Sequence, residues 1–245
     1  MNPSQLTSNP DVQRFGLLLL CLLALFILCP LLETTQISTG TVDAYLSLTL
    51  LVTLYSIRDQ PLVAKLGGAL GFLALLAAIG DHVFMVSSLL LGHLCGVLFF
   101  FMTGAALLRR VLQRGPLGRG RLHAAACAYL LLGHGAALVF SVLEHVQPGS
   151  FQDPLAGAAP AHAVLVGYPH LVYYSFTTLT TLGFGDVIPL SPLARSLSTL
   201  LALVGQLYLA LLVGRLVGLY VSEEARAASS AAESANSPAS APLGL

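Results

Sequence analysis

Residues 173–189 read YYSFTTLTTLGFGDVIP and join a short aromatic and threonine-rich segment to the spaced glycines Gly183 and Gly185. A long apolar run lies on each side, at 122–143 and at 196–221. Between these runs the chain becomes polar and contains Pro and Gly, which predicts a re-entrant loop. Irregular backbone at membrane depth is tolerated only where protein buries it or where it lines a water-filled cavity. The pattern therefore indicates a membrane protein whose loop serves an aqueous pathway.

The composition of the whole chain also indicates a membrane protein. The chain has 245 residues, of which 56% are hydrophobic and only 9% are charged, and its mean hydropathy is +0.83. Soluble domains carry about 25% charged residues. Because a helix needs about 20 apolar residues to cross the hydrocarbon core, we expect an all-α membrane protein with six transmembrane helices. The expected spans are 15–32, 41–57, 62–80, 83–108, 122–143 and 196–221.

The basic residues set the expected orientation. Lys and Arg concentrate in cytoplasmic loops, and with the amino terminus inside, only Arg195 of the eleven lies outside. Both termini of this multi-pass protein of the cell membrane are therefore expected in the cytoplasm. The expected divisions are a cytoplasmic N-terminus at 1–14, four membrane helices at 15–108, a basic linker at 109–121, a pore domain at 122–221 with its loop at 144–195, and a disordered cytoplasmic tail at 222–245.

The stretch 173–189 closely resembles the pore signature of the potassium-channel family, with TLGFGD in place of the commoner TVGYGD. A span on each side completes the resemblance, whereas the first four spans match only the general layout of six-span channels. The resemblance implies a re-entrant pore helix at 171–180 and passive conduction of K+. It also implies a selectivity filter made by Thr181, Leu182, Gly183, Phe184 and Gly185.

The residue types in the filter also suit this chemistry on physical grounds. A potassium ion must shed its water, and stacked rings of backbone carbonyls can replace that shell. Successive carbonyls of a strand reach one axis only if alternate residues have positive φ, which Gly183 and Gly185 allow at little steric cost. Thr181 can add its hydroxyl to the innermost ring. One loop cannot surround an ion, so a homotetramer is the simplest closed arrangement; K+ is the transported ion and no cofactor is expected.

Residues around the filter are expected to brace it. Tyr173 and Tyr174 occupy the aromatic positions that family members use to support the filter, and Thr177 stands where several members carry a glutamate. Phe184 lacks the hydroxyl that the usual Tyr donates to the supporting helix. Asp186 is expected at the outer mouth, where a carboxylate ring concentrates cations. A turn-capping role is the alternative for Asp186.

The last span is expected to line the inner cavity. Gly205 follows Gly185 by 20 residues (205 − 185), where the resemblance places a hinge, and helix packing is the alternative reason for a small residue. Gln206 is the only uncharged amide of this span and is expected on the cavity wall, with a hydrogen bond to a neighbouring helix as the alternative. Arg215, inside a GxxxG spacing, is expected to snorkel to the cytoplasmic interface.

The fourth span argues against strong voltage gating. Residues 83–108 contain no Lys or Arg, whereas a charge that crosses the field contributes only about 2.3 kcal/mol per 100 mV, so a sensor needs several. The basic residues gather just after this span. This basic set consists of Arg109, Arg110, Arg114, Arg119 and Arg121. It has two open interpretations, contact with anionic lipid headgroups and a positive-inside loop without a regulatory role.

The remaining reactive residues form no pattern that predicts an enzyme. Neither a nucleophile–base pair nor a metal-ligand spacing stands out. The four cysteines, Cys21, Cys29, Cys95 and Cys127, all fall in expected spans and are interpreted as buried thiols. His93 and His134 are interpreted as packing residues, while three histidines fall in the outer loop without metal spacing: His145, His162 and His170.

Two other functions remain open at this level. Within channels, the alternative is a cation channel that discriminates poorly between potassium and sodium, because a loose filter loses ring geometry. From another class, the chain is compatible with a potassium-uptake transporter subunit or a membrane sensor that reuses the pore fold. Transporters of that type resemble fused pore units with degraded filters, whereas this chain has one intact unit.

Overall fold

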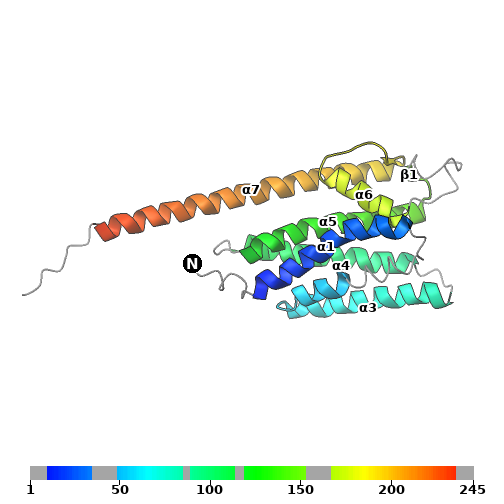
Figure 1. Ribbon diagram of the computed structural model, residues 1–245. Helices are drawn as coiled ribbons and strands as arrows, with labels where there is room; N and C mark the ends of the chain where they lie inside the picture. Colours follow the sequence, from blue (N-terminus) through cyan, green and yellow to red (C-terminus); the bar gives the residue numbers. More distant parts are fainter. Residues whose placement is uncertain (1–9, 35–48, 85–88, 114–118, 153–166, 236–245) are drawn as a thin grey trace, which may run out of the picture.

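The computed structural model describes residues 10–34, 49–84, 89–113, 119–152 and 167–235, which are mainly helical (Figure 1). A helical stretch covers 49–56. The other elements are α1 (Pro10–Thr34), α3 (Pro61–Phe84), α4 (Leu89–Leu112), α5 (Arg119–Val146), β1 (Phe151–Gln152), α6 (Tyr168–Leu179), β2 (Ile188–Pro189) and α7 (Pro192–Ala235). The mainly helical class expected from the sequence is confirmed.

Several of these helices are long and apolar enough to cross a membrane. In the part of the chain that the structure describes, three stretches meet this criterion, and two shorter apolar stretches lie in α1 and α3. The long stretches are Leu90–Leu112, Gly120–Val146 and Pro192–Arg215, and the shorter ones are Val12–Ala24 and Pro61–Ala77. The count of six spans stays a prediction, because residues 41–48 of the expected second span lie outside the described residues.

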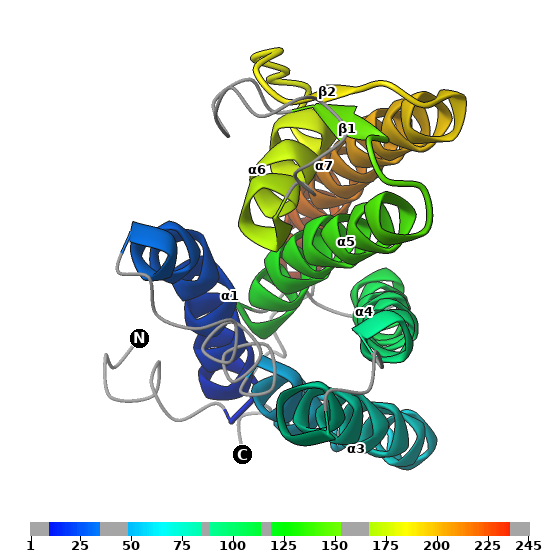
Figure 2. The same ribbon diagram turned by 90° about the vertical axis from the view of Figure 1, so that its right-hand side faces the viewer.

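The helices form a bundle with one helix that projects from it. Figure 1 shows α1, α3, α4 and α5 running side by side, while α7 extends well beyond their ends. The end-on view of Figure 2 places the short α6 against α5 and α7, with α3 on the far side of α4. Helix α5 is thus the central element, since it packs against α1, α4, α6 and α7.

Two apolar clusters hold the bundle together. The first joins α1, α4 and α5 through buried side chains such as Leu22, Phe99 and Leu131. The second joins α5, α6 and α7 through residues such as Phe140 and Leu171. Because lipid tails are as apolar as leucine, close van der Waals packing rather than exclusion of water stabilises such contacts in a membrane. The second cluster fixes the position of the re-entrant segment.

The expected start of the fourth span is wrong. Residues 83 and 84 belong to α3, and α4 begins at Leu89. The expected spans left out Asp81 and His82 between 80 and 83, but these residues continue the helix. A polar side chain does not break the backbone hydrogen-bond pattern, and a glycine such as Gly80 costs a helix only about 1 kcal/mol relative to alanine.

Helix α7 also differs from the sequence-based expectation. It continues through Ala235, so residues 222–235 are helical where a disordered tail was expected, while 236–245 lie outside the described residues. The segment is rich in alanine, the best helix former. A helix that the preceding span has already nucleated gains one hydrogen bond for each residue added, which explains the extension.

Candidate functional site

The short helix α6 lies where the sequence predicts a pore helix, at Tyr168–Leu179 against the expected 171–180. A proline stands in its first turn, where the missing N–H costs no helical hydrogen bond. The Ser175 hydroxyl donates to the Gly133 carbonyl of α5 at 2.9 Å. The Phe176 ring packs against Gly133 so closely that a Cβ there would collide with it. A glycine in α5 therefore sets how closely α6 approaches.

After α6 the backbone takes a left-handed conformation at every second residue. The φ angle is 58° at Thr181, 52° at Gly183 and 79° at Gly185. The Gly183 N–H donates to the Thr177 carbonyl at 3.1 Å, which turns the strand back over the end of α6. A Cβ on either glycine would meet nothing within 4 Å, so these glycines serve backbone conformation rather than close packing.

All five residues from Thr181 to Gly185 are exposed in the single chain. The large side chains of Leu182 and Phe184 are 57% and 67% exposed. These residues, which we call the glycine strand, have no regular secondary structure and are left-handed at 181, 183 and 185. One chain by itself leaves this strand unenclosed.

Tyr173 braces the exit of the strand. Its hydroxyl donates to Asp186 Oδ2 at 2.5 Å, and its ring stacks on the Phe184 ring at 6.5 Å between centroids and 3° between planes. Asp186 Oδ1 also accepts the N–H of the next residue, Val187, at 2.9 Å. The Tyr173 hydrogen bond holds the pKa of the Asp186 carboxyl below its usual value, because with the backbone N–H donors it outweighs desolvation.

Tyr174 and Thr177 take different roles. The Tyr174 hydroxyl donates to Ser198 Oγ at 2.6 Å and so joins α6 to α7, and Ser198 donates in turn to the Ala194 carbonyl. The Thr177 hydroxyl donates within α6, to the Tyr174 carbonyl at 3.0 Å. Thr177 therefore supports the strand through its own carbonyl rather than through its side chain.

The inner face of the site is formed by α7. Gln206 Nε2 donates to Thr181 Oγ1 at 3.2 Å, so this amide lies directly beneath the first residue of the strand. Gly205 is buried against the end of α6, where a Cβ would collide with the Leu179 carbonyl oxygen. Tyr129 of α5 donates to the same oxygen at 3.3 Å. The geometry at Gly205 favours the packing interpretation of this glycine, in a helix that is continuous through it.

A buried carboxylate that the sequence analysis did not single out stabilises the turn between α5 and β1. Glu144 is 2% exposed, and its two oxygens accept the N–H groups of Gly149 and Phe151 at 3.0 Å each. Strand β1, at Phe151–Gln152, pairs antiparallel with β2, which follows the glycine strand. The Phe151 ring also packs on Tyr174 of α6. An acidic residue at the very end of an apolar run was the available signal for Glu144.

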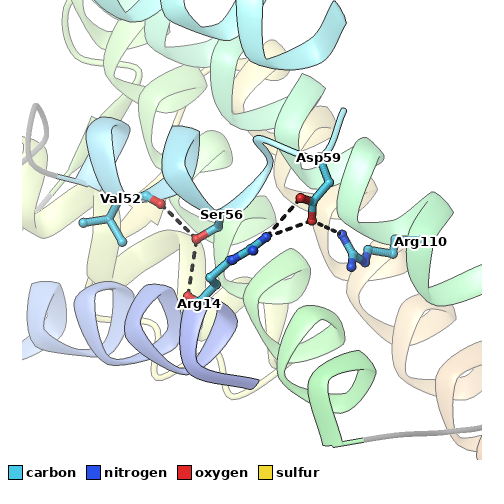
Figure 3. A network of polar contacts seen from close by, with 5 residues as sticks. All are labelled: Arg14, Val52, Ser56, Asp59 and Arg110. Carbon is cyan, nitrogen blue, oxygen red and sulfur yellow. Dashed lines mark hydrogen bonds and ion pairs between the residues drawn. The ribbon is translucent and has the colours of Figure 1, made fainter. Parts of the chain in front are cut away.

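An ion-pair network lies at the end of the bundle opposite α6 (Figure 3). We call this end, which contains Arg14, Asp59 and Arg110, the basic end. Arg14 of α1 and Arg110 of α4 contact Asp59 at 3.0 and 3.2 Å. Ser56 donates to the Arg14 carbonyl at 3.3 Å. Desolvation acts to raise the pKa of Asp59, but the hydrogen bonds and charges of Arg110 and Arg14 outweigh it and hold that pKa below its usual value.

The basic linker residues do not act as one set. Arg110 pairs with Asp59 and lies over the Phe15 ring at 5.1 Å. Arg121 of α5 and Arg215 of α7 both donate to the Gln113 carbonyl at the end of α4, at 3.1 and 2.5 Å. Arg109 is exposed, whereas Arg114 and the side chain of Arg119 lie outside the described part of the chain. Arg215 thus lies at the basic end, as snorkelling requires.

Histidines and cysteines form no metal site within the described residues, where no group of three or more His, Cys, Asp or Glu converges. Cys21, Cys95 and Cys127 are buried thiols, as expected. His134 is buried between the Phe100 and Phe176 rings. His93 packs against Tyr168. His162 and the side chain of Cys29 lie outside the described part.

Comparison with known proteins identifies the same region. Residues 158–222 match a family model described as an ion channel, which covers α6, the glycine strand and the first part of α7. An inward rectifier potassium channel of Paramagnetospirillum magnetotacticum, Kirbac3.1, is 36% identical over 85 residues, which make up 35% of this chain and 21% of that relative. The match thus spans about a fifth of the relative's length. The resemblance of the pore segment to the potassium-channel family is confirmed, and with its apolar helices the chain is a membrane protein with an ion channel domain.

Proposed function

We propose that this chain is one subunit of a homotetrameric, potassium-selective channel that conducts K+ passively. Its filter is formed by Thr181, Leu182, Gly183, Phe184 and Gly185, and K+ is the transported ion, with no cofactor needed. The observation that carries the proposal is the left-handed conformation at residues 181, 183 and 185. An ordinary extended strand points successive carbonyls to opposite sides. Left-handed residues at every second position turn them towards one side, where they can replace the hydration shell of an ion.

The helix before the strand adds to this chemistry. The carbonyl end of α6 at Leu179 lies beside Gln206 and Gly205 of α7, near the inner end of the strand. A helix carries a negative partial charge at its carboxyl end, which favours a cation nearby. Four such ends around an axis would stabilise a hydrated cation in the cavity that Gln206 is proposed to line.

The exposed surfaces of the single chain support assembly into a ring. The filter strand is exposed along its whole length, and α7 presents large apolar side chains that are more than half exposed, among them Leu200, Leu203, Leu207 and Leu211. Four copies around a cyclic axis would enclose the strand and cover part of this apolar surface. Asp186 would stand at the outer mouth, with its carboxylate anchored by Tyr173.

Gating by voltage is proposed to be weak. The basic residues in α4 that the structure describes are Arg109 and Arg110, both in its last turn. Arg110 is paired with Asp59, so α4 has no ladder of charges to carry through the field. We place the protein in the cell membrane with both termini in the cytoplasm and the basic end facing inward, where Arg109 would meet anionic headgroups.

Ion flux through purified full-length protein in liposomes tests the proposal. Liposomes loaded with KCl and diluted into a potassium-free medium should lose K+ through the protein when an ionophore balances charge, and those loaded with NaCl should retain Na+. The mass of the active species in detergent should equal four chains. Equal loss of both ions would replace the proposal by a weakly selective cation channel, and a tetramer that passes neither ion would favour a sensor.

A further inference from the structure

An apolar cavity of about 240 Å³ lies away from the pore, between the helical stretch 49–56, α3 and α4. Three glycines of α3, at 67, 68 and 71, help to form it. A Cβ at Gly68 would approach Leu54 only to 3.7 Å, and one at Gly71 would approach Leu50 only to 4.0 Å. Side chains at these two positions would therefore fit, but they would fill the space that the glycines leave open.

The mouth of the cavity lies on the exposed side of the bundle. Leu51 and Phe72, which both line it, are 64% and 63% exposed. In a membrane protein such an apolar surface faces lipid. The volume is below the roughly 300–1,000 Å³ of sites that enclose drug-sized ligands. Its size and lining suit a segment of a linear hydrocarbon better than a compact polar ligand.

The stretch of α3 from Lys65 to the last cavity-lining residue corresponds to about one leaflet of the bilayer. Lys65 stands less than one turn before Gly68 in α3, and Leu75 lines the cavity at its far end. At 1.5 Å per residue, the ten residues from Lys65 to Leu75 (75 − 65) rise about 15 Å. This is about half of the 30 Å hydrocarbon core. A lipid with its headgroup at Lys65 would therefore place its acyl chain along the cavity.

Two cationic residues, Arg58 and Lys65, stand close in sequence to the cavity-lining residues Leu54 and Gly67. Lys65 shares one face of α3 with Gly68, Phe72 and Leu75, which follow at intervals of three, four and three residues. Arg58 follows Leu54 by four residues, and its guanidinium lies 5.1 Å from the centroid of the Tyr55 ring. Both cations are exposed.

The nearby acid does not offset these cations. Asp59 already pairs with Arg14 and Arg110. The local charge is therefore positive and complements a phosphate, whereas a zwitterionic headgroup would add a third cation to Arg58 and Lys65.

We propose that this cavity binds an anionic membrane lipid, whose acyl chain fills the space and whose headgroup phosphate is bound by Arg58 and Lys65. The lipid belongs to the leaflet at the basic end of the bundle. The proposed lipid site requires only that the protein lies in a membrane. The proposal is therefore independent of which ion the pore conducts. It is distinct from the arginines of the basic linker at 109–121, since its two cations lie just before α3 and in the second turn of α3.

The lack of tryptophan in the chain permits a direct test. A Leu51→Trp variant of the full chain places the sole tryptophan at the cavity mouth. The matched control is Leu20→Trp on α1, because Leu20 is similarly exposed, at 66% against 64%. Leu20 lies six residues from Arg14 and Leu51 lies seven residues from Arg58, so the two probes sit at nearly equal depth. Fluorescence quenching is then measured in vesicles over the same range of mole fractions of brominated phosphatidylglycerol or brominated phosphatidylcholine.

The proposal predicts that phosphatidylglycerol quenches the tryptophan at 51 at a severalfold lower mole fraction than phosphatidylcholine does. At position 20 the two lipids should quench the tryptophan equally well. Each basic side chain near the surface should contribute about fivefold to this preference. Adding Arg58→Gln and Lys65→Gln to the Leu51→Trp variant should abolish the preference, whereas adding Arg109→Gln should leave it. Gly68→Leu, which fills the cavity, should also abolish it, while Gly16→Leu, in open space on α1, should not.

Equal lipid preference at the two probes would overturn the proposal, and so would a preference that survives Gly68→Leu. A preference for phosphatidylglycerol that survives the loss of both cations would assign the selectivity to another part of the protein and would equally refute the site. If Leu51→Trp does not fold, Phe72→Trp probes the same mouth from α3 with a smaller change in shape.

Discussion

Replacing either glycine of the proposed filter with alanine tests backbone conformation separately from packing. Gly185 has φ 79° and Gly183 has φ 52°, and an added Cβ would meet nothing within 4 Å at either position. The cost of alanine is therefore conformational. For an L-residue the left-handed region costs roughly 1–2 kcal/mol. Four copies in a ring would multiply this to about 4–8 kcal/mol for each proposed tetramer.

The effect on conduction should be large. At about 1.4 kcal/mol for each factor of ten, a cost of about 4 kcal/mol lowers the population of the conducting backbone by roughly a thousandfold. Gly183→Ala or Gly185→Ala should therefore abolish K+ loss from KCl-loaded liposomes, while the mass of the assembly in detergent stays that of the wild type. Gly16→Ala in α1, which also faces open space but is helical, should conduct normally. Normal selective flux through either filter mutant would refute the reasoning.

Three further predictions concern the cavity, the voltage response and the outer mouth. Gln206 contacts Thr181 beneath the filter, so Gln206→Asp should create a ring of charge and make outward current sensitive to internal magnesium or polyamines; a mutant without added block would place Gln206 off the pathway. Conductance in symmetric potassium should depend only weakly on voltage, and a steep curve that persists without blocking ions would contradict this. Tyr173→Phe removes the hydrogen bond that lowers the pKa of Asp186, so that pKa should rise towards the ordinary value of about 3.9. The Asp186 carboxylate stays ionised, and keeps its hydrogen bond from Tyr173, until the pH falls through its lowered pKa in the folded protein. Wild-type selectivity should therefore hold as external pH falls to about 5. Tyr173→Phe should weaken selectivity already at neutral pH. Unchanged selectivity in Tyr173→Phe would show that the brace is dispensable.

The pore segment was predictable because its signal is local. A glycine at 183 and 185 follows directly from the conformation that those positions adopt, and the length of α6 follows from the apolar and aromatic residues before it. Thr181 was not expected to be left-handed, since a β-branched residue rarely is. The residue type of Thr181 therefore gave no signal for this conformation.

Contacts between distant parts of the chain were not predictable in the same way. Glu144 folds back on Phe151, and Arg14 meets Asp59 across 45 residues. In the sequence each of these charged residues is indistinguishable from any other charge at the membrane–water interface. Its partner is determined only by how the helices pack. The helical continuation of α7 after 221 was missed because composition indicates whether a segment can fold alone, whereas this segment extends a helix already formed.

The reversal potential of the reconstituted wild-type protein, with potassium on one side and sodium on the other, tests the central claim most directly. A filter built from the carbonyls of residues 181–185 should hold the potential at strongly potassium-selective values, displaced from zero by about 59 mV for each tenfold preference for K+ over Na+. Displacement by about 100 mV or more is the predicted result. A reversal potential near zero, in protein that conducts, would contradict the assignment of a potassium-selective filter.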